Sequence, residues 1–138
     1  DTITREIGTQ VGGDEGQDDA DRLYEMGLVY LEMGLFDQAC ESLQKAAEDT
    51  EFAVRAREMW GIALSRASRP DEAVDVLEAG LEAAKAGSQE FLGLLYHIGR
   101  AHEQAGRMDE ALAHYTRIQE QDRSYLDVGK RVAALTTV

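Results

Sequence analysis

The sequence predicts an all-α protein in which three helical hairpins follow one another and a single further helix closes the array. Helix-favouring residues (Ala, Leu, Glu, Gln and Arg) dominate the 138-residue chain, which contains one proline. From Asp19 onward, apolar residues recur at the spacing of a helix face. A pattern of helix, break and helix also returns at regular intervals, and this repetition indicates stacked hairpins rather than one bundle.

Residues 1–18 are expected to form a flexible acidic lead-in. Residues 1–21 contain seven acidic residues, one basic residue and four glycines, and they lack aromatic residues. Ile3, Ile7 and Val11 recur every four residues, which leaves a short helical turn open as an alternative. The sequence begins at Asp1 rather than at methionine, so we expect a piece of a longer protein.

Residues 19–123 contain three copies of one unit. The copies read LYEMGLVYLEMGLFDQACESLQKA, REMWGIALSRASRPDEAVDVLEAG and LYHIGRAHEQAGRMDEALAHYTRI. Their glycines Gly27, Gly61 and Gly99 lie 34 and 38 residues apart, from the differences 61 − 27 and 99 − 61. In each copy a break follows the glycine, and the letters DQA or DEA open a second helix. The three units are predicted to span about 20–53, 54–91 and 92–123.

The unusual residues of the unit have predictable structural roles. Gly27, Gly61 and Gly99 are expected where the second helix of a hairpin crosses the first most closely, because a side chain there would separate the backbones. Gly34 and Gly106 are expected to end first helices in the left-handed conformation. Pro70 is expected in the first turn of its helix, where proline is tolerated. The small residues that face the glycines from the second helices are expected to be Ala39, Ala73 and Ala111.

The third hairpin and the end of the chain show two further features. The extra residues before the third copy predict one added turn on a helix 70–86, ended by Gly87, with Ser88 capping the next helix. Residues 124–138 are predicted to form a C-terminal cap helix that covers the apolar face of the last hairpin. Lys130 and Arg131 are expected on the outer face of that helix.

The repeated unit resembles the tetratricopeptide repeat, a helix–turn–helix unit that stacks into a right-handed superhelix. The matching residues of the first copy are Leu23, Gly27, Tyr30, Gly34, Phe36, Ala39, Leu43 and Ala46, those of the second are Gly61, Leu64, Ala73 and Leu77, and those of the third are Leu95, Gly99, Gly106, Ala111 and Tyr115. The second copy departs from the family pattern at Arg57 and Gly80. The C-terminal end loosely resembles tetratricopeptide modules at the end of large bacterial multidomain scaffold proteins.

Charge and composition exclude several classes of function. The formal net charge is −13, with 14 basic and 27 acidic residues, so binding to nucleic acid or to an anionic membrane surface is not expected. No long uncharged apolar run predicts a membrane span. Cys40 is the only cysteine, which excludes an intrachain disulfide and fits a reducing compartment. A soluble, cytoplasmic and monomeric module is expected.

Motifs for catalysis, cofactors or metals are not found in the sequence, so we predict a protein that is not an enzyme and needs no cofactor. His97, His102 and His114 lack the spacing of a zinc motif, and His102 falls at an interior packing position of the unit. Acidic pairs such as Asp71–Glu72 open second helices, where their charge complements the helix dipole. The prediction for catalytic and metal sites is therefore none.

The family resemblance implies a concave groove that is lined by the first helices and binds a protein or peptide. Arginine and tyrosine are frequent at binding hot spots. The residues predicted to bind the partner are Tyr24, Leu28, Leu31, Arg55, Met59, Ile62, Arg66, Tyr96 and Arg100. Further groove positions are Asp21, Glu25, Glu32, Glu58, Ser65, Gly93, His97, Glu103 and Gln104. The alternative is that the apolar members pack beneath neighbouring hairpins and that the arginines pair with Glu58 and Glu103.

The predicted function is recruitment of a partner peptide, helix or small protein, as part of a larger bacterial scaffold or regulatory protein. The resemblance suggests a regulator of polarity or motility, such as a small GTPase, as the partner. The alternative is a structural module that self-associates and spaces neighbouring domains. The carboxylate clamp of chaperone-binding members is not expected, since Tyr24, Leu28 and Gly93 occupy three of its positions.

Overall fold

The computed structural model describes the backbone of residues 12–136 and the side chains of residues 19–136. Its helices are α2 (Gly12–Glu32), α3 (Phe36–Ala46), α4 (Ala53–Arg66), α5 (Pro70–Ala83), α6 (Gln89–Gln104), α7 (Met108–Gln121) and α8 (Val128–Thr136). The described part contains no strand. In that part, no helix is both long enough and apolar enough to cross a membrane.

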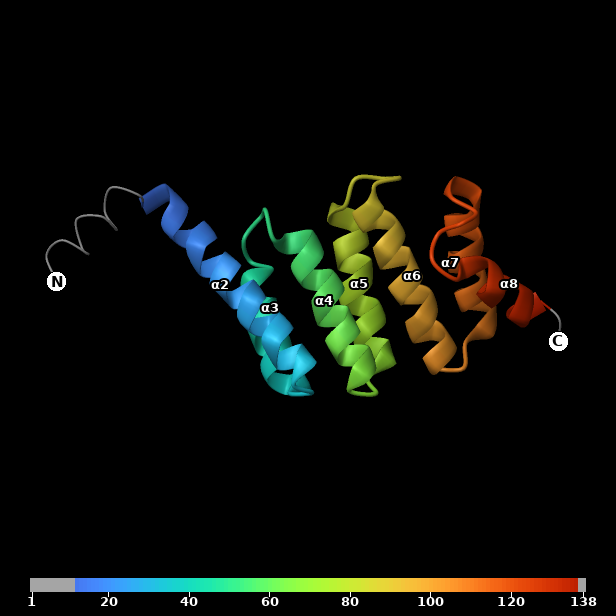
Figure 1. Cartoon of the computed structure of the whole chain (residues 1–138), viewed down its shortest axis with the longest axis horizontal. Helices are drawn as coiled ribbons and strands as arrows, with labels where there is room; N and C mark the ends of the chain where they lie inside the picture. Colours follow the sequence, from blue (N-terminus) through green and yellow to red (C-terminus); the bar gives the residue numbers. More distant parts are fainter. Residues whose placement is uncertain (1–11, 137–138) are drawn as a thin grey trace, which may run out of the picture.

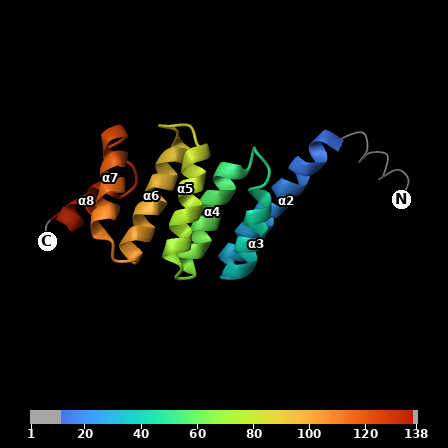
Figure 2. The same cartoon turned by 180° about the vertical axis from the view of Figure 1, so that it is seen from behind.

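The helices stand side by side in one row that runs from α2 at one end to α8 at the other (Figures 1 and 2). The main contacts join helices that are consecutive in the chain, and α4 also contacts α6, the first helix of the next hairpin. The predicted all-α array of three hairpins with a capping helix is therefore confirmed.

Close approach of the two helices within each hairpin depends on a glycine in the first helix. A Cβ atom added to Gly27 would lie 2.5 Å from Leu43 Cγ, and one added to Gly61 would lie 2.4 Å from Leu77 Cγ. In the third hairpin, a Cβ atom on Gly99 would lie 2.5 Å from the Tyr115 ring. These positions have no room for a side chain, so their expected role is confirmed.

The three hairpin turns share one backbone geometry. Gly34 and Gly106 have φ angles of +75° and +81°, and Ser68 adopts the same left-handed conformation at +63°. The next residue in each turn donates its N–H to a carbonyl five residues earlier, as Leu35 does to Tyr30 at 2.9 Å. Such a bond is typical of helix ends that require a left-handed residue. Ser68 thus occupies the glycine position of the second copy, which the sequence analysis did not identify.

Three predicted boundaries differ from the structure. Helix α2 begins at Gly12, so residues 12–18 of the expected lead-in are helical, and residues 1–11 lie outside the described part. A glycine costs about 1 kcal/mol in a helix, which weakens a helix without forbidding it.

The predicted helix 70–86 ends at Ala83 instead, because Ala84 is already extended with ψ 150°. The extra residues therefore lengthen the loop, and Ser88 caps α6 by accepting a hydrogen bond from the N–H of Phe91 at 3.1 Å. The cap helix begins at Val128 rather than near residue 124, after Leu126 with a positive φ.

The buried apolar residues form separate clusters along the row, and one of them lies at the C-terminal end. Residues of α6, α7 and α8 form one cluster there, which includes Phe91, Tyr115, Ile118 and Val128. Val128 is fully buried, so α8 covers the last hairpin as predicted.

Candidate peptide-binding groove

The first helices α4 and α6 face a shared pocket of about 490 Å³. Ile62, Ser65 and Arg66 line it from α4, while His97, Arg100, Glu103 and Gln104 line it from α6, and Arg131 lines it from α8. The Gln104 side-chain amide donates a hydrogen bond to the Ser65 carbonyl at 2.9 Å, which joins the two helices at one end of the pocket. We call this surface the groove pocket.

Basic side chains dominate the groove pocket although the whole chain is strongly acidic. Arg66 and Arg100 are exposed, and neither forms an ion pair with any residue of the described part. Arg131, in contrast, pairs with Glu103 and with Asp127, each at 3.1 Å. Arg66 and Arg100 are therefore the cations of this pocket that remain open to a ligand.

A polar network holds Arg131 in the pocket wall and fixes α8 on the last hairpin. The Tyr96 hydroxyl donates to Asp127 at 2.6 Å, and Arg131 Nε donates to the same hydroxyl at 3.2 Å. The Tyr115 hydroxyl donates to Glu103 at 2.6 Å. The hydrogen bond from Tyr96 is the main cause that lowers the pKa of the Asp127 carboxyl. The expectation that Arg131 lies on the outer face was wrong, because these partners draw its guanidinium inward.

Glu58 and His97 form a half-buried pair beside the pocket. The Glu58 carboxylate fits over Gly93, since a Cβ atom there would lie 2.4 Å from Glu58 Oε2. Burial, followed by the charge of Glu90, raises the pKa of Glu58 to about 7. Burial, followed by the arginines Arg100 and Arg66, lowers the pKa of His97 to about 4. The two side chains are 3.8 Å apart, and near pH 7 the imidazole is neutral.

These two pKa shifts make the stability of the fold depend on pH in opposite directions. The pKa of Glu58 lies above its usual 4.5, so the cost of burying its charge is full above about pH 7 and disappears as the pH falls to 4.5. The pKa of His97 lies below its usual 6.5, so its contribution is present above pH 6.5 and is lost as the pH falls toward 4. Between pH 6.5 and 4.5 the two effects oppose each other.

Three of the nine residues predicted to bind a partner line the groove pocket, namely Ile62, Arg66 and Arg100. Two others are buried, since Leu31 is 5% exposed and Tyr96 is 7% exposed. Leu31 packs between the first two hairpins, and Tyr96 packs against the cap helix, so the core takes both side chains.

The remaining four residues lie nearer the N-terminal end, outside the groove pocket. The Arg55 guanidinium stacks on Phe52 and Tyr24, at 4.2 Å and 5.5 Å from the ring centroids. Leu28 and Met59 are half-buried, and Met59 packs on the cluster around Leu43. The residues predicted to bind the partner are thus divided between the polar groove pocket, an aromatic–arginine stack and the apolar core.

The pocket also contains a residue that the groove positions did not include. Arg131 comes from the cap helix, whereas the sequence analysis considered first helices alone. Its spacing of four residues from Asp127 was the available signal, since opposite charges at that spacing pair along a helix. Nothing in the sequence indicated that Arg131 would also form an ion pair with Glu103 of α6.

Comparisons with known proteins agree with this architecture. The tetratricopeptide repeat family profile matches residues 24–89 and, in a second overlapping match, residues 58–125. No curated protein matches the chain at a significant level.

Solved structures share the fold at low sequence identity. The first tetratricopeptide domain of Spaghetti (RPAP3), bound to the HSP90 peptide SRMEEVD, superposes with a TM-score of 0.76 at 16% identity, over 87% of this chain and 92% of that one. A tetratricopeptide-like protein from Chlorobium tepidum has a TM-score of 0.68 at 16% identity, over 89% and 93% of the two chains. The Yersinia enterocolitica secretion chaperone SycD, in complex with a peptide of the translocator YopD, has a TM-score of 0.72 at 16% identity, over 87% and 94%. With the family profile matched over most of its length, this chain belongs to the tetratricopeptide repeat family.

Proposed function

We propose that this protein binds an acidic segment of a partner protein in the groove pocket, and that Arg66 and Arg100 contact its carboxylates. The observation that carries the proposal is the pair of exposed arginines that have no ion-pair partner among the described residues, beside a pocket of about 490 Å³. Arginine pairs with carboxylates through two parallel hydrogen bonds, which gives both affinity and orientation.

The shape and composition of the pocket suit a peptide better than a small substrate. The pocket is open and has one apolar wall residue, Ile62, so a ligand with alternating apolar and acidic side chains fits its chemistry. The related structures of Spaghetti (RPAP3) and SycD each contain a bound peptide, which supports peptide recognition by this fold. The tetratricopeptide fold is generally non-catalytic.

The proposal is tested with fluorescently labelled synthetic peptides in which apolar and Glu residues alternate, and with matched peptides in which Lys replaces Glu. We expect the acidic peptides to bind, the basic peptides not to bind, and added salt to weaken binding. Arg66→Ala and Arg100→Ala should each weaken binding about 5- to 30-fold, which corresponds to a hot-spot loss of about 1–2 kcal/mol.

Arg117→Ala provides the matched control, since Arg117 is also exposed but stacks on Phe91, outside the groove pocket. That variant should bind the acidic peptides as the wild type does. Undiminished binding by the double variant Arg66→Ala/Arg100→Ala would place the binding site elsewhere and refute the proposal.

One observation favours the alternative of self-association. Met26 and Val29 of α2 and Met33, which directly follows that helix, are 44%, 53% and 64% exposed. Exposed apolar side chains at helical spacing are typical of a surface that another helix covers. Light scattering of the wild type and of Met33→Glu would distinguish a self-associating module from a monomeric one. Only a dimer whose interface contains these residues would dissociate in the variant.

The remaining parts of the prediction concern the context of the module. Membership of a larger bacterial scaffold or regulatory protein, a small GTPase as the partner, and a cytoplasmic location remain predictions. Titration of a purified GTPase in both nucleotide states would test the partner, and equal absence of binding in both states would contradict it.

A further inference from the structure

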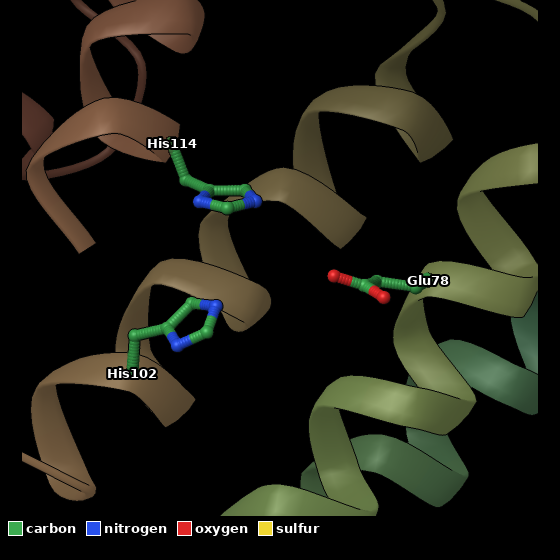
Figure 3. A group of neighbouring side chains, drawn as sticks. All are labelled: Glu78, His102 and His114. Carbon is green, nitrogen blue, oxygen red and sulfur yellow. The ribbon is translucent and has the colours of Figure 1, made fainter. Parts of the chain in front are cut away.

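The side of the array formed by α5 and α7 brings together three side chains that the peptide groove does not use. Glu78 comes from α5, His102 from the C-terminal half of α6, and His114 from α7. One potential ligand atom from each of the three side chains lies within 4.8 Å of those of the other two. Figure 3 shows both imidazole rings with a nitrogen edge toward the Glu78 carboxylate.

The hydrogen bond of His114 leaves one ring nitrogen ready for a metal. His114 Nδ1 lies 2.8 Å from the Glu110 carbonyl, and a carbonyl can only accept, so Nδ1 carries the proton. The lone pair is then on Nε2. Metal-binding histidines are commonly oriented by such a bond from the other ring nitrogen.

His102 is held in place by burial and by one cation. Its side chain is 8% exposed, and its ring stands 5.3 Å from that of His114 between centroids. Burial is the main cause that lowers the pKa of His102, which favours the neutral form of its imidazole. Neutral imidazole is the form that coordinates a metal.

We propose that Glu78, His102 and His114 form a zinc site that joins the second hairpin to the third, with water completing the coordination. Two imidazoles and one carboxylate are a ligand set that zinc accepts. Neighbouring ligand atoms of a tetrahedral zinc site lie about 3.4 Å apart, from bonds of about 2.0–2.1 Å. The present spacing of up to 4.8 Å must therefore contract by up to about 1.4 Å, and the exposed, flexible Glu78 side chain can supply part of that movement.

Arg107 opposes zinc in this site. Its Nε donates to His102 Nδ1 at 2.9 Å, so the ring proton of the neutral imidazole is on Nε2. Binding of zinc to Nε2 displaces that proton, Nδ1 takes one up, and the Arg107 side chain turns away. Arg107 is also paired with Asp71 at the surface at 2.8 Å, which gives the displaced guanidinium an existing partner.

The consequence of the site is a brace between consecutive repeats. Glu78 belongs to the second hairpin and both histidines belong to the third, so bound zinc fixes the angle between the two hairpins. The groove pocket lies between α4 and α6, the first helices of the same two hairpins. A zinc brace would thus set the width of the proposed peptide site.

The test is titration of metal-free protein with zinc chloride by calorimetry, in a Cys40→Ser background that removes the single thiol. We expect one equivalent to bind, a higher melting temperature with zinc, and a return to the original value with EDTA. Cobalt(II) in place of zinc should give the visible absorption of a site with nitrogen and oxygen ligands.

The variants identify the ligands. Glu78→Gln and His114→Ala should each weaken zinc binding at least about tenfold, since each removes one of three protein ligands. Glu82→Gln removes a carboxylate one turn further along the same helix and should bind zinc as the wild type does. Arg107→Ala should bind zinc more tightly, because it removes a cation and frees His102 Nδ1.

Three results would overturn the proposal. The first is failure of the wild type to bind zinc at millimolar concentration. The second is equal weakening by Glu82→Gln and Glu78→Gln, which would mean diffuse attraction to an acidic surface. The third is binding by Arg107→Ala that is no tighter than that of the wild type, which would contradict the assignment of His102 as a ligand.

Discussion

Substitution of Gly61 by alanine tests the packing of the hairpins most directly. In an exposed helix this change would raise the free energy of unfolding by at most about 1 kcal/mol, because alanine has the higher helix propensity. Here the new Cβ atom would lie 2.4 Å from both Cγ and Cδ2 of Leu77. Leu77 is fully buried, and rotation about its χ2 torsion moves the Cδ atoms but leaves Cγ in place, so that rotation cannot relieve the contact.

The expected outcome is a net loss of stability. Overpacking of a core typically costs about 1–3 kcal/mol, and a contact this short belongs at the upper end of that range. After the propensity gain is subtracted, Gly61→Ala should lower the free energy of unfolding by roughly 1–2 kcal/mol. Urea denaturation followed by far-ultraviolet circular dichroism measures this difference.

Gly129→Ala is the matched control. Gly129 lies in α8, and a Cβ atom there meets only the Gln119 side chain, at 3.9 Å. This variant should be as stable as the wild type or more stable by up to about 1 kcal/mol.

A double-mutant cycle then tests the contact itself. Leu77→Ala alone should cost about 2–5 kcal/mol. Combined with Gly61→Ala, the loss should be smaller than the sum of the two single losses by about 1–2 kcal/mol, because the smaller side chain makes room for the new methyl group. If Gly61→Ala proved as stable as the wild type, the close crossing of α4 and α5 would not be what requires glycine.

Three further predictions concern other parts of the array. Ser68→Gly should raise the free energy of unfolding by about 0.5–1 kcal/mol, since glycine adopts φ +63° without strain; urea denaturation would show it, and a loss would contradict the turn geometry. Glu58→Gln should raise stability at about pH 8 by on the order of 2 kcal/mol, because no charge is then buried there. Between pH 6.5 and 4.5 that variant should lose stability with acid more steeply than the wild type, since only the His97 effect remains, and parallel curves would refute the opposed shifts. A peptide that ends in Glu-Glu-Val-Asp should not bind with micromolar affinity in a calorimetric titration, because Tyr24, Leu28 and Gly93 replace the clamp residues.

Local sequence patterns predicted the elements of this fold well. Glycines at fixed offsets, the Asp-Glu-Ala openings and Pro70 mark backbone requirements that depend on a few neighbouring residues. The same reasoning failed at helix ends, where competing local preferences differ little in free energy. Residues 84–86 contain good helix formers, for example, yet the chain leaves the helix at Ala84 to reach the Ser88 cap.

The candidate site was harder to predict because it depends on which side chains the core takes. Leu31 and Tyr96 occupy groove positions in the repeat pattern, but each has a neighbouring hairpin or helix that buries it. Arg131 and the pair His102–His114 depend on contacts between separate helices, which periodicity within one helix does not report.

The pattern of contacts along the row bears on how such a chain can change in length during evolution. Each helix packs mainly on its immediate neighbours, so duplication of a segment that encodes one hairpin adds a unit while the existing interfaces persist. The two ends are not equivalent in this respect. Because Arg131 of α8 reaches back to Glu103 and Tyr96 in α6, a hairpin inserted before α8 would separate this arginine from both partners, and growth at the α2 end would conserve them.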